Sequence, residues 1–397
     1  MNIKITGGRC EGKIKSIPSK SYAHRIAICN FLSGNKIDGG CFGYSSEDIK
    51  ATVRCLNSLL EGENVLDCGE SGSTLRFILP LVAARGGQYR LVGHGKLMER
   101  PNDELFRVLE DNGVNVKMQD GIIVDGKLRA GNFKIRGDIS SQYISGLLLC
   151  LPTLSGDSFI ELTTPLLSKP YVEITLEVLS GYGIEIKRLD NGYFVKGGQQ
   201  YNGNLMAEGD WSNAAFFLVL GAISGNITLS GLNLSSAQGD RVIMQVLKDA
   251  GAKIEVDGDD VKVSKNKLLP FNFNAEDYPD LVPIVAVLAS QSNGVSVIEN
   301  VERLKIKESD RINSTLAMLN VFGIKAEYKG SNIYVYGGTA KGGTAHSFND
   351  HRIAMASAVL ATATNGESLI TNANAVNKSY PEFFDDLKSV GGVVEYV

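Results

Sequence analysis

A repeated pattern of apolar helices with polar first residues limits the possible folds of this chain more than any other feature. Six stretches share the pattern, in which a short entry of Ser, Asp, Asn or Gly leads into an apolar segment rich in small residues. They span residues 18–33, 71–84, 140–155, 210–224, 277–290 and 349–364. Segments of this composition are typical of helices that are buried, not of helices that face solvent on one side.

Glycine recurs at a near-constant interval along most of the chain. Each of these glycines follows an apolar segment and precedes residues that alternate as in a strand. They are Gly113, Gly183, Gly251, Gly323 and Gly392. The interval of roughly 70 residues indicates an internal repeat. We therefore predict six structural units, the first two compressed and the sixth closed by the two ends of the chain.

Length and charge exclude several classes of protein. A chain of 397 residues is too long for one compact core, so two domains are expected. The net charge of −4, without a basic run, argues against a nucleic-acid partner. No uncharged apolar segment reaches the length of about 18 residues that suggests a membrane span. The first residues lack the apolar region of a signal peptide, so a cytoplasmic location is expected.

Cysteine and histidine give no sign of a metal centre. The six cysteines, Cys10, Cys29, Cys41, Cys55, Cys68 and Cys150, are scattered and form no CxxC motif, which favours free thiols in a reducing compartment. The closest pair of the four histidines is His346 and His351, without a cysteine nearby. We expect no metal ion.

Basic side chains gather at the predicted helix starts and turns. Helix N-termini attract anions, so cations placed there suit phosphate and carboxylate groups. The set comprises Lys20, Arg25, Arg76, Arg100, Lys307, Arg311, Arg352 and Lys378. If the helix starts of each half point at one cleft, that cleft is strongly cationic. Taken one by one, these residues are equally compatible with capped helices and solvated surface charges.

Two carboxylates stand among these cations. A site built only to bind anions would exclude Asp280 and Glu308, so we interpret them as groups that accept or donate protons. Asp280 alone is also compatible with a helix N-terminal acid stabilised by the helix dipole. The neutral run Ser140, Ser141 and Gln142 suits hydroxyl or phosphate recognition, or serves as a double N-cap. No Walker phosphate loop and no GxSxG motif is present.

Nine blocks in order along the whole chain resemble the 5-enolpyruvylshikimate-3-phosphate synthase family. They read PSKSYAHR, ESGSTLR, LMERP, SSQYISGLL, SKPYVEITL, EGDWSNAAFFL, KIKESDR, NDHRIAMA and NKSYPEFF. The resemblance implies an α/β (α+β) fold, a two-domain inside-out α/β barrel of six βαβαββ-type units with buried helices. It implies a lower domain of residues 1–18 plus 209–397, an upper domain of residues 19–208, and an active site in the cleft between them.

The resemblance also implies a reaction. The family transfers the enolpyruvyl group of phosphoenolpyruvate to the 5-hydroxyl of shikimate 3-phosphate and releases phosphate. This is the sixth step of the shikimate pathway to chorismate and the aromatic amino acids, and it needs no metal and no organic cofactor. The resemblance further implies a monomer without nucleic-acid or membrane partners, and glyphosate as a possible inhibitor.

Site residues follow from the matching motifs. The shikimate 3-phosphate set implied by the resemblance is Lys20, Ser21, Arg25, Ser140, Ser141, Gln142, Ser168, Asp280 and Lys307. The phosphoenolpyruvate set is Lys20, Gly72, Arg100, Gln142, Arg311, Arg352 and Lys378. The implied catalytic residues are Asp280, Glu308 and Lys20. Which of the three moves which proton stays open at the level of the motifs.

The sequence departs from the family pattern at two positions, and two alternative functions are considered beside this one. Glu70 occupies a position where many family members carry Asn, and Arg303 stands where some carry Asn. The related UDP-N-acetylglucosamine enolpyruvyl transferases usually carry a reactive Cys ahead of an Arg-Pro pair, and the loop LVGHGKLMERP contains none. A non-catalytic anion-binding protein on the same scaffold would not need the carboxylates.

Overall fold

The computed structural model describes residues 1–37 and 46–397. The chain divides into two compact units. Unit 1 comprises Met1–Ile17 and Glu208–Val397, and unit 2 comprises Pro18–Ala207. Cys41 lies outside the described residues, and the other five cysteines are free and buried.

The predicted repeat corresponds to a recurring four-stranded sheet. In the described part of the chain five such sheets share one topology, a parallel pair at one edge followed by two antiparallel pairs. The two sheets of unit 2 are β3 (Val65–Asp67), β4 (Gly87–Val92), β6 (Ile122–Gly126), β5 (Val114–Met118), and β7 (Asn132–Ile135), β8 (Ser158–Leu162), β10 (Gly192–Val195), β9 (Ile186–Leu189).

The three sheets of unit 1 repeat the same order. They are β2 (Cys10–Lys15), β11 (Gly225–Ser230), β13 (Asp260–Ser264), β12 (Lys253–Asp257); β14 (Asn272–Asn274), β15 (Val295–Glu299), β17 (Asn332–Tyr336), β16 (Ala326–Lys329); and β18 (Thr344–His346), β19 (Glu367–Thr371), β1 (Ile3–Thr6), β20 (Val393–Tyr396). The elements of four sheets follow a βαβαββ order along the chain, and in the sheet of β18 the last strand of this order is supplied by β1 from the N-terminus.

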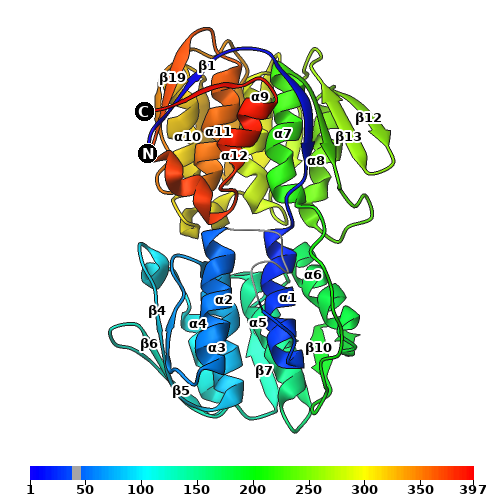
Figure 1. The fold of residues 1–397 in the computed structure, drawn as a ribbon, viewed down its shortest axis with the longest axis vertical. Helices are drawn as coiled ribbons and strands as arrows, with labels where there is room; N and C mark the ends of the chain where they lie inside the picture. The colour runs from blue at the N-terminus through cyan, green and yellow to red at the C-terminus, as the bar shows by residue number, and fades with distance from the viewer. Residues whose placement is uncertain (38–45) are drawn as a thin grey trace. The chain divides into compact units, whose positions relative to one another are not determined.

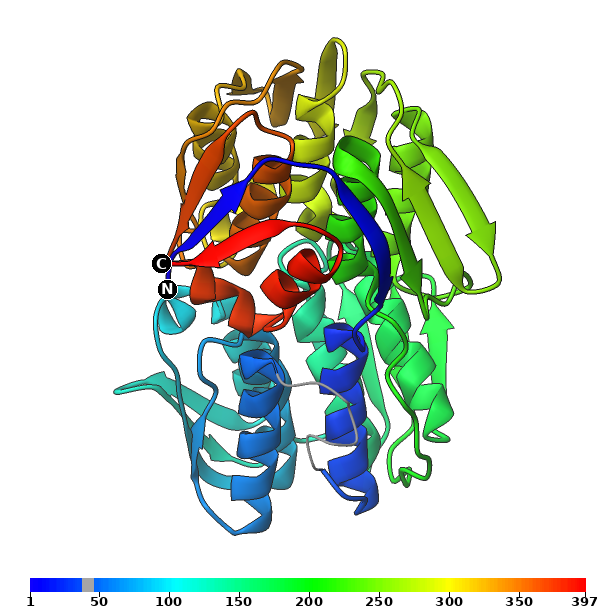
Figure 2. The same cartoon turned by 45° about the horizontal axis from the view of Figure 1, so that its top comes forward.

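The two ends of the chain complete unit 1. Strand β1 pairs antiparallel with both β19 and β20, so that Ile3 lies between Ile370 and Tyr396. Figure 2 shows the blue N-terminal strand beside the red C-terminal strand. Strand β2 runs parallel to β11. The first 17 residues therefore belong to the same unit as the last 190 because they supply strands to its sheets.

The apolar stretches form interior helices. In unit 1 the helices α7 (Trp211–Ser224), α9 (Val282–Ser290) and α11 (His351–Thr362) pack on one another (Figure 1). Every residue of α9 and α11 is buried. The remaining helices of this unit are α8 (Ile243–Asp249), α10 (Arg311–Val321) and α12 (Phe383–Ser389).

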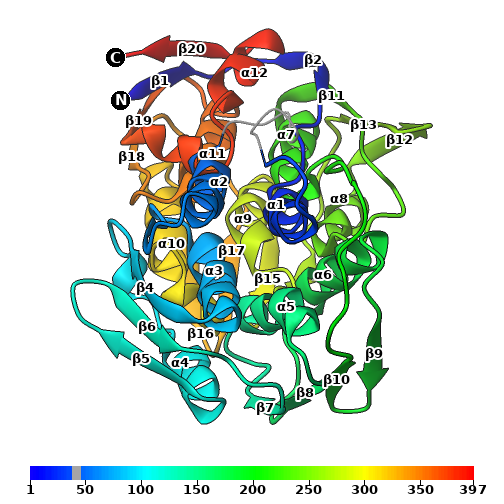
Figure 3. The ribbon, with the colours of Figure 1, turned by 60° about the horizontal axis from the view of Figure 1, so that its bottom comes forward.

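In the described part of unit 2, the helices α1, α2, α3, α5 and α6 form a ring in which each helix contacts the next. Helix α1 contacts α2, α2 contacts α3, α3 contacts α5, α5 contacts α6, and α6 contacts α1, as can be followed in Figure 3. The bounds are α1 (Lys20–Ser33), α2 (Glu47–Leu60), α3 (Gly72–Arg85), α4 (Asp103–Asp111), α5 (Ser141–Cys150) and α6 (Lys169–Gly181). The apolar helices α1, α3 and α5 are largely buried along their length, whereas α2, α4 and α6 also expose residues to solvent.

The periodic glycines terminate the second helix of each repeat. Gly113, Gly183, Gly251 and Gly323 have φ values of 95°, 76°, 79° and 73°, each two residues after a helix ends. This left-handed conformation favours glycine because a side chain would meet the backbone. In the last repeat the left-handed residue is Gly391, with φ 91°, because α12 ends at Ser389. The sequence pattern indicates Gly392 as the periodic glycine of this repeat, which is wrong by one position.

We predict that Gly183→Ala destabilises the protein by about 1–2 kcal/mol, because alanine must adopt the left-handed conformation. Urea unfolding measures the effect. Gly8→Ala is the matched control, since its backbone is not left-handed and no atom lies within 4 Å of the added methyl group. Equal stability of the two variants would contradict the role assigned to these glycines.

Candidate active site

Several of the predicted site residues of each unit lie at or near the N-terminal ends of its helices. In unit 2, Lys20 begins α1, Gly72 begins α3 and Ser141 begins α5. In unit 1, Arg311 begins α10 and Arg352 is the second residue of α11. Backbone N–H groups and the positive end of each helix dipole add to the side-chain charge there, which makes these ends suitable for anions.

Arg25 ties three helices of unit 2 together. Its guanidinium donates to Thr175 Oγ1 at 2.7 Å and to Ser145 Oγ at 3.3 Å. It also donates to the carbonyl oxygens of Ser21 at 2.6 Å and Tyr171 at 2.8 Å. Burial lowers the pKa of Arg25 to about 10, so it stays charged at neutral pH. A guanidinium has five N–H groups, so these contacts leave one on Nη1 for a ligand.

Lys20 has a carboxylate partner that sequence reasoning missed. Its Nζ lies 2.8 Å from a carboxylate oxygen of Asp48, and both side chains are largely buried. Asp48 sits in the first turn of α2, where an acid is an ordinary dipole partner. Local sequence therefore could not reveal that Asp48 compensates the charge of a lysine 28 residues earlier.

Gly72 and Arg100, both predicted to bind phosphoenolpyruvate, lie in contact. A methyl group added at Gly72 would lie 2.4 Å from Arg100 Nη1, so a side chain there would displace the guanidinium from this position. Gln142 is nearby, with its Nε2 donating to Ser73 Oγ at 2.8 Å. Glu70, the departure noted in the sequence, has its carboxylate beside the backbone of Gly95, where an added methyl group would lie 2.9 Å away.

The two serine positions differ in their local geometry. Ser140 caps α5, and its Oγ accepts from the backbone N–H of Gln142 at 3.3 Å. Ser168 precedes α6 with φ 56° and ψ 41°, and its side chain is buried. A left-handed serine carries a backbone strain of order 1–3 kcal/mol, and such strain clusters at functional sites.

Arg311 is the centre of the charged cluster in unit 1. Its side chain is 2% exposed and lies 2.6 Å from Asp280 Oδ1 and 2.7 Å from Asp350 Oδ2. Glu308 Oε1 is 3.6 Å from its Nη2. Burial opposes the charge, but the three carboxylates outweigh burial and raise the pKa of the guanidinium. Arg311 is therefore charged throughout the physiological range.

Asp280 lies among three cations. Besides Arg311, Lys307 Nζ and Arg352 Nη2 each lie 3.6 Å from its carboxylate. Arg352 Nη1 also donates to the Asp280 carbonyl oxygen at 3.1 Å. The structure thus brings together four residues that the sequence placed at three separate helix starts. Lys378, the last predicted cation, is buried and donates to the carbonyl oxygen of Asn349 at 2.7 Å.

Glu308 is paired with His351, a contact that the sequence pattern does not predict. His351 is buried, and its Nδ1 lies 2.8 Å from Glu308 Oε2. Together with Asp350 these residues place ligand-type atoms within 4.8 Å of one another. However, both oxygens of Asp350 already accept hydrogen bonds, from Arg311, from Ser309 Oγ and from the backbone N–H of Arg352. The cluster is accounted for by ion pairs and a helix cap.

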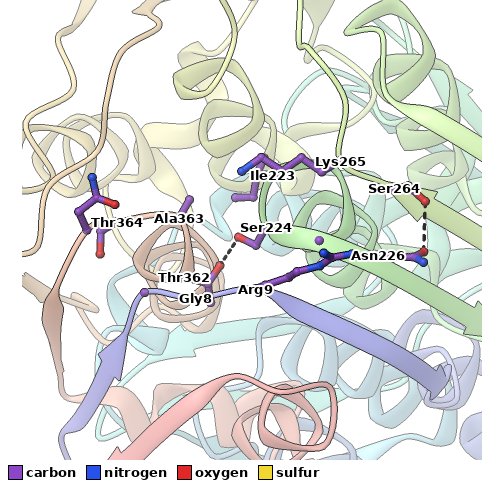
Figure 4. A pocket seen from close by; sticks show the side chains of 13 residues that line it. Gly8, Arg9, Ile223, Ser224, Asn226, Ser264, Lys265, Thr362, Ala363 and Thr364 are labelled. Atoms are coloured by element: carbon purple, nitrogen blue, oxygen red, sulfur yellow. Dashed lines mark hydrogen bonds between the residues drawn. The ribbon is translucent and has the colours of Figure 1, made fainter.

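A cavity of about 610 Å³ in unit 1 lies at the opposite end of the helices (Figure 4). Ser224 and Thr362, the last residues of α7 and α11, line it, and their hydroxyl oxygens are 2.6 Å apart. Helix C-termini carry partial negative charge, whereas Arg9 and Lys265, which also line the cavity, are cations. None of the predicted site residues lines this cavity, so it is distinct from the cationic cluster.

Comparison with known proteins assigns the chain to a family. A family model described as EPSP synthase (3-phosphoshikimate 1-carboxyvinyltransferase) matches residues 42–387. The chain belongs to the EPSP synthase family. A curated relative in Clostridium kluyveri, named 3-phosphoshikimate 1-carboxyvinyltransferase, is 39% identical over 418 residues and covers 99% of this chain and 98% of the relative. A relative of the same name in Clostridium novyi is 38% identical with the same coverage.

The solved structures agree on the fold of the EPSP synthase family. An EPSP synthase from Acinetobacter baumannii matches with a TM-score of 0.80 at 21% identity, covering 100% of both chains. This likeness confirms the predicted mixed α/β fold. No helix formed by residues 1–37 or 46–397 is long and apolar enough to cross a membrane.

We predict that Arg311→Met destabilises the protein by about 3–5 kcal/mol, because Asp350, which is 0% exposed, loses its charged partner. Chemical denaturation of the two variants Arg311→Met and Arg9→Met measures the difference. Arg9 is the control because its side chain is 72% exposed, and its loss is expected to cost less than about 0.5 kcal/mol. A loss below about 1 kcal/mol for Arg311→Met would contradict its central place in the cluster.

Proposed function

We propose that this chain is a 3-phosphoshikimate 1-carboxyvinyltransferase. It transfers the enolpyruvyl group of phosphoenolpyruvate to the 5-hydroxyl of shikimate 3-phosphate and releases phosphate, the sixth step of the shikimate pathway. The observation that carries this proposal is the near full-length match to relatives of that name. The clusters of cations at the helix starts support it, since both substrates carry phosphate and carboxylate groups.

Residues of both units are proposed to serve the same pair of substrates. Lys20, Ser21, Arg25, Ser140, Ser141, Gln142 and Ser168 of unit 2, with Asp280 and Lys307 of unit 1, bind shikimate 3-phosphate. Gly72 and Arg100 of unit 2, with Arg311, Arg352 and Lys378 of unit 1, bind phosphoenolpyruvate, and Lys20 and Gln142 contact both. The positive charge at each set of helix ends supports this division.

The reaction follows an addition–elimination course. The 5-hydroxyl oxygen attacks C2 of phosphoenolpyruvate and loses its proton, while C3 gains a proton and becomes a methyl group. The tetrahedral adduct then loses a proton from C3 and expels phosphate, which restores the double bond. The surrounding cations are already in place and stabilise the negative charge on the adduct and on the leaving phosphate.

Asp280 and Glu308 are the proposed proton carriers. Asp280 is held by three cations as a carboxylate, which suits acceptance of the hydroxyl proton. Glu308 is oriented by His351, and this contact supports its assignment to proton transfer at C3. Lys20, paired with Asp48, supplies a further proton donor and a positive charge.

Several finer features are also part of the proposal. The recurring four-stranded sheets around buried helices support six units in an inside-out barrel arrangement. We propose a monomer in the cytoplasm. Glyphosate is a candidate inhibitor, because Gly72 has no side chain and so leaves open a small space beside the positively charged Arg100. Glu70 makes the degree of sensitivity specific to this chain.

Phosphate release tests the proposed reaction. Purified protein is mixed with phosphoenolpyruvate and either shikimate 3-phosphate or UDP-N-acetylglucosamine, and inorganic phosphate is measured. We expect release only with shikimate 3-phosphate. Release only with the nucleotide sugar would assign the chain to the other enolpyruvyl transfer, and release with neither acceptor would favour an anion-binding protein without catalysis.

We predict that Asp280→Asn lowers kcat by about 10²–10⁴-fold, because the amide cannot accept the hydroxyl proton. Steady-state kinetics measures turnover, and calorimetry measures the affinity for shikimate 3-phosphate, which is expected to change much less than kcat. Asp257→Asn serves as a matched control, since Asp257 is exposed on β12 in the same unit. Full turnover by Asp280→Asn would remove Asp280 from the proton chemistry.

A further inference from the structure

Arg76 is a buried cation in unit 2 that contacts only neutral acceptors. It is 6% exposed, and its guanidinium bonds to Asn102 Oδ1 at 3.0 Å, Gln142 Oε1 at 2.7 Å and the Pro101 carbonyl oxygen at 3.0 Å. The ring of Tyr143 lies 5.2 Å from its Cζ. No ion pair joins it to a carboxylate within the described residues. Burying a charge in this way is costly, so its position calls for a functional explanation.

The contact with Gln142 determines how that side chain is oriented. A guanidinium donates hydrogen bonds and accepts none, so the atom that faces Arg76 must be the amide oxygen. The amide nitrogen then faces Ser73 Oγ at 2.8 Å. A primary amide nitrogen has two N–H groups, so one remains to donate to a ligand. The reversed amide would present its carbonyl oxygen instead, which repels phosphate and carboxylate groups.

Arg76 is also connected to the backbone of Arg100 through Asn102. Asn102 accepts from Arg76 Nε and donates from its Nδ2 to the Arg100 carbonyl oxygen at 3.0 Å. Asn102 is itself buried. Through Asn102 and Pro101 the guanidinium therefore holds the segment that places Arg100 against Gly72. Arg76 thus contacts, directly or through one residue, two residues of the proposed site.

We propose that Arg76 is a positioning residue that orients the Gln142 amide with its N–H toward the substrates and holds the segment carrying Arg100. It acts through these groups and contacts no substrate itself. This inference rests on the proposed binding roles of Gln142 and Arg100. Residues that orient a reacting site in this way typically change activity by about 10–100-fold when they are replaced.

A double-mutant cycle tests the inference. The variants are Arg76→Met, Gln142→Met and the double variant, with kcat and KM measured for each substrate. We expect about 10–100-fold lower kcat/KM for Arg76→Met. Gln142→Met is expected to lower kcat/KM in the parent protein and to have little further effect in the Arg76→Met background, since the amide is no longer oriented there. A purely structural role for Arg76 would give losses that multiply.

Four further variants keep the test decisive. Arg85→Met replaces an exposed arginine at the other end of α3 and is expected to keep the parent activity. If Arg76→Met does not fold, Arg76→Lys takes its place in the cycle, because it keeps the charge but cannot bridge the three acceptors. Added guanidinium ion is expected to restore part of the activity of Arg76→Ala, and not of Arg76→Ala combined with Gln142→Met.

The outcomes separate this inference from the proposed function. If Gln142→Met costs as much in the Arg76→Met background as in the parent, Arg76 does not act through Gln142 and the inference is wrong. If Gln142→Met keeps full activity in the parent, the binding role of Gln142 fails and the inference fails with it. In both cases phosphate release with shikimate 3-phosphate by the parent protein still establishes the reaction.

Discussion

Burial of helices that are apolar on every side is the constraint on which the rest of the structure depends. Such helices can present polar groups only at their ends, and the sheets that surround them have to cover their flanks. In unit 1 the helices α7, α9 and α11 pack together without a solvent face. The chemistry of the protein is consequently confined to the helix starts.

Charges confined in this way have to be balanced at short range. Arg311 illustrates the balance, because a guanidinium that is 2% exposed is held by carboxylates from two other elements. Lys20 and Asp48 repeat the arrangement in unit 2. Arg76 is an exception, as Arg25 is, since its partners are an asparagine, a glutamine and a carbonyl oxygen. Because the acceptors of Arg76 are neutral, its positive charge adds to the electrostatic potential around it, which suits a site for anions.

The repeat explains how a chain with few classical motifs builds such a site. Each βαβαββ unit brings one interior helix, and its outer helix ends at a left-handed glycine such as Gly251 or Gly323. Neighbouring repeats then bring their helix starts together, as the contact of Asp280 with Arg352 shows. Residues from different repeats thereby share one cluster, although no single segment carries a complete motif.

Much of the fold and of the residue set could be predicted from the sequence, because apolar composition and glycine spacing are local properties. Lys20, Arg311 and Asp280 could be placed at helix starts for the same reason. The partners of these charged residues could not be identified from the sequence. Asp48 looks locally like an ordinary acid in a first helical turn, and Asp350 looks like a helix cap that is followed by a histidine, His351. Only tertiary structure brings Arg311 to Asp350 across 39 residues and Arg76 to Gln142 across 66. The sequence alone determined the repeat and the positions of the charges; tertiary packing decided which charges pair, because pairing depends on distance in space.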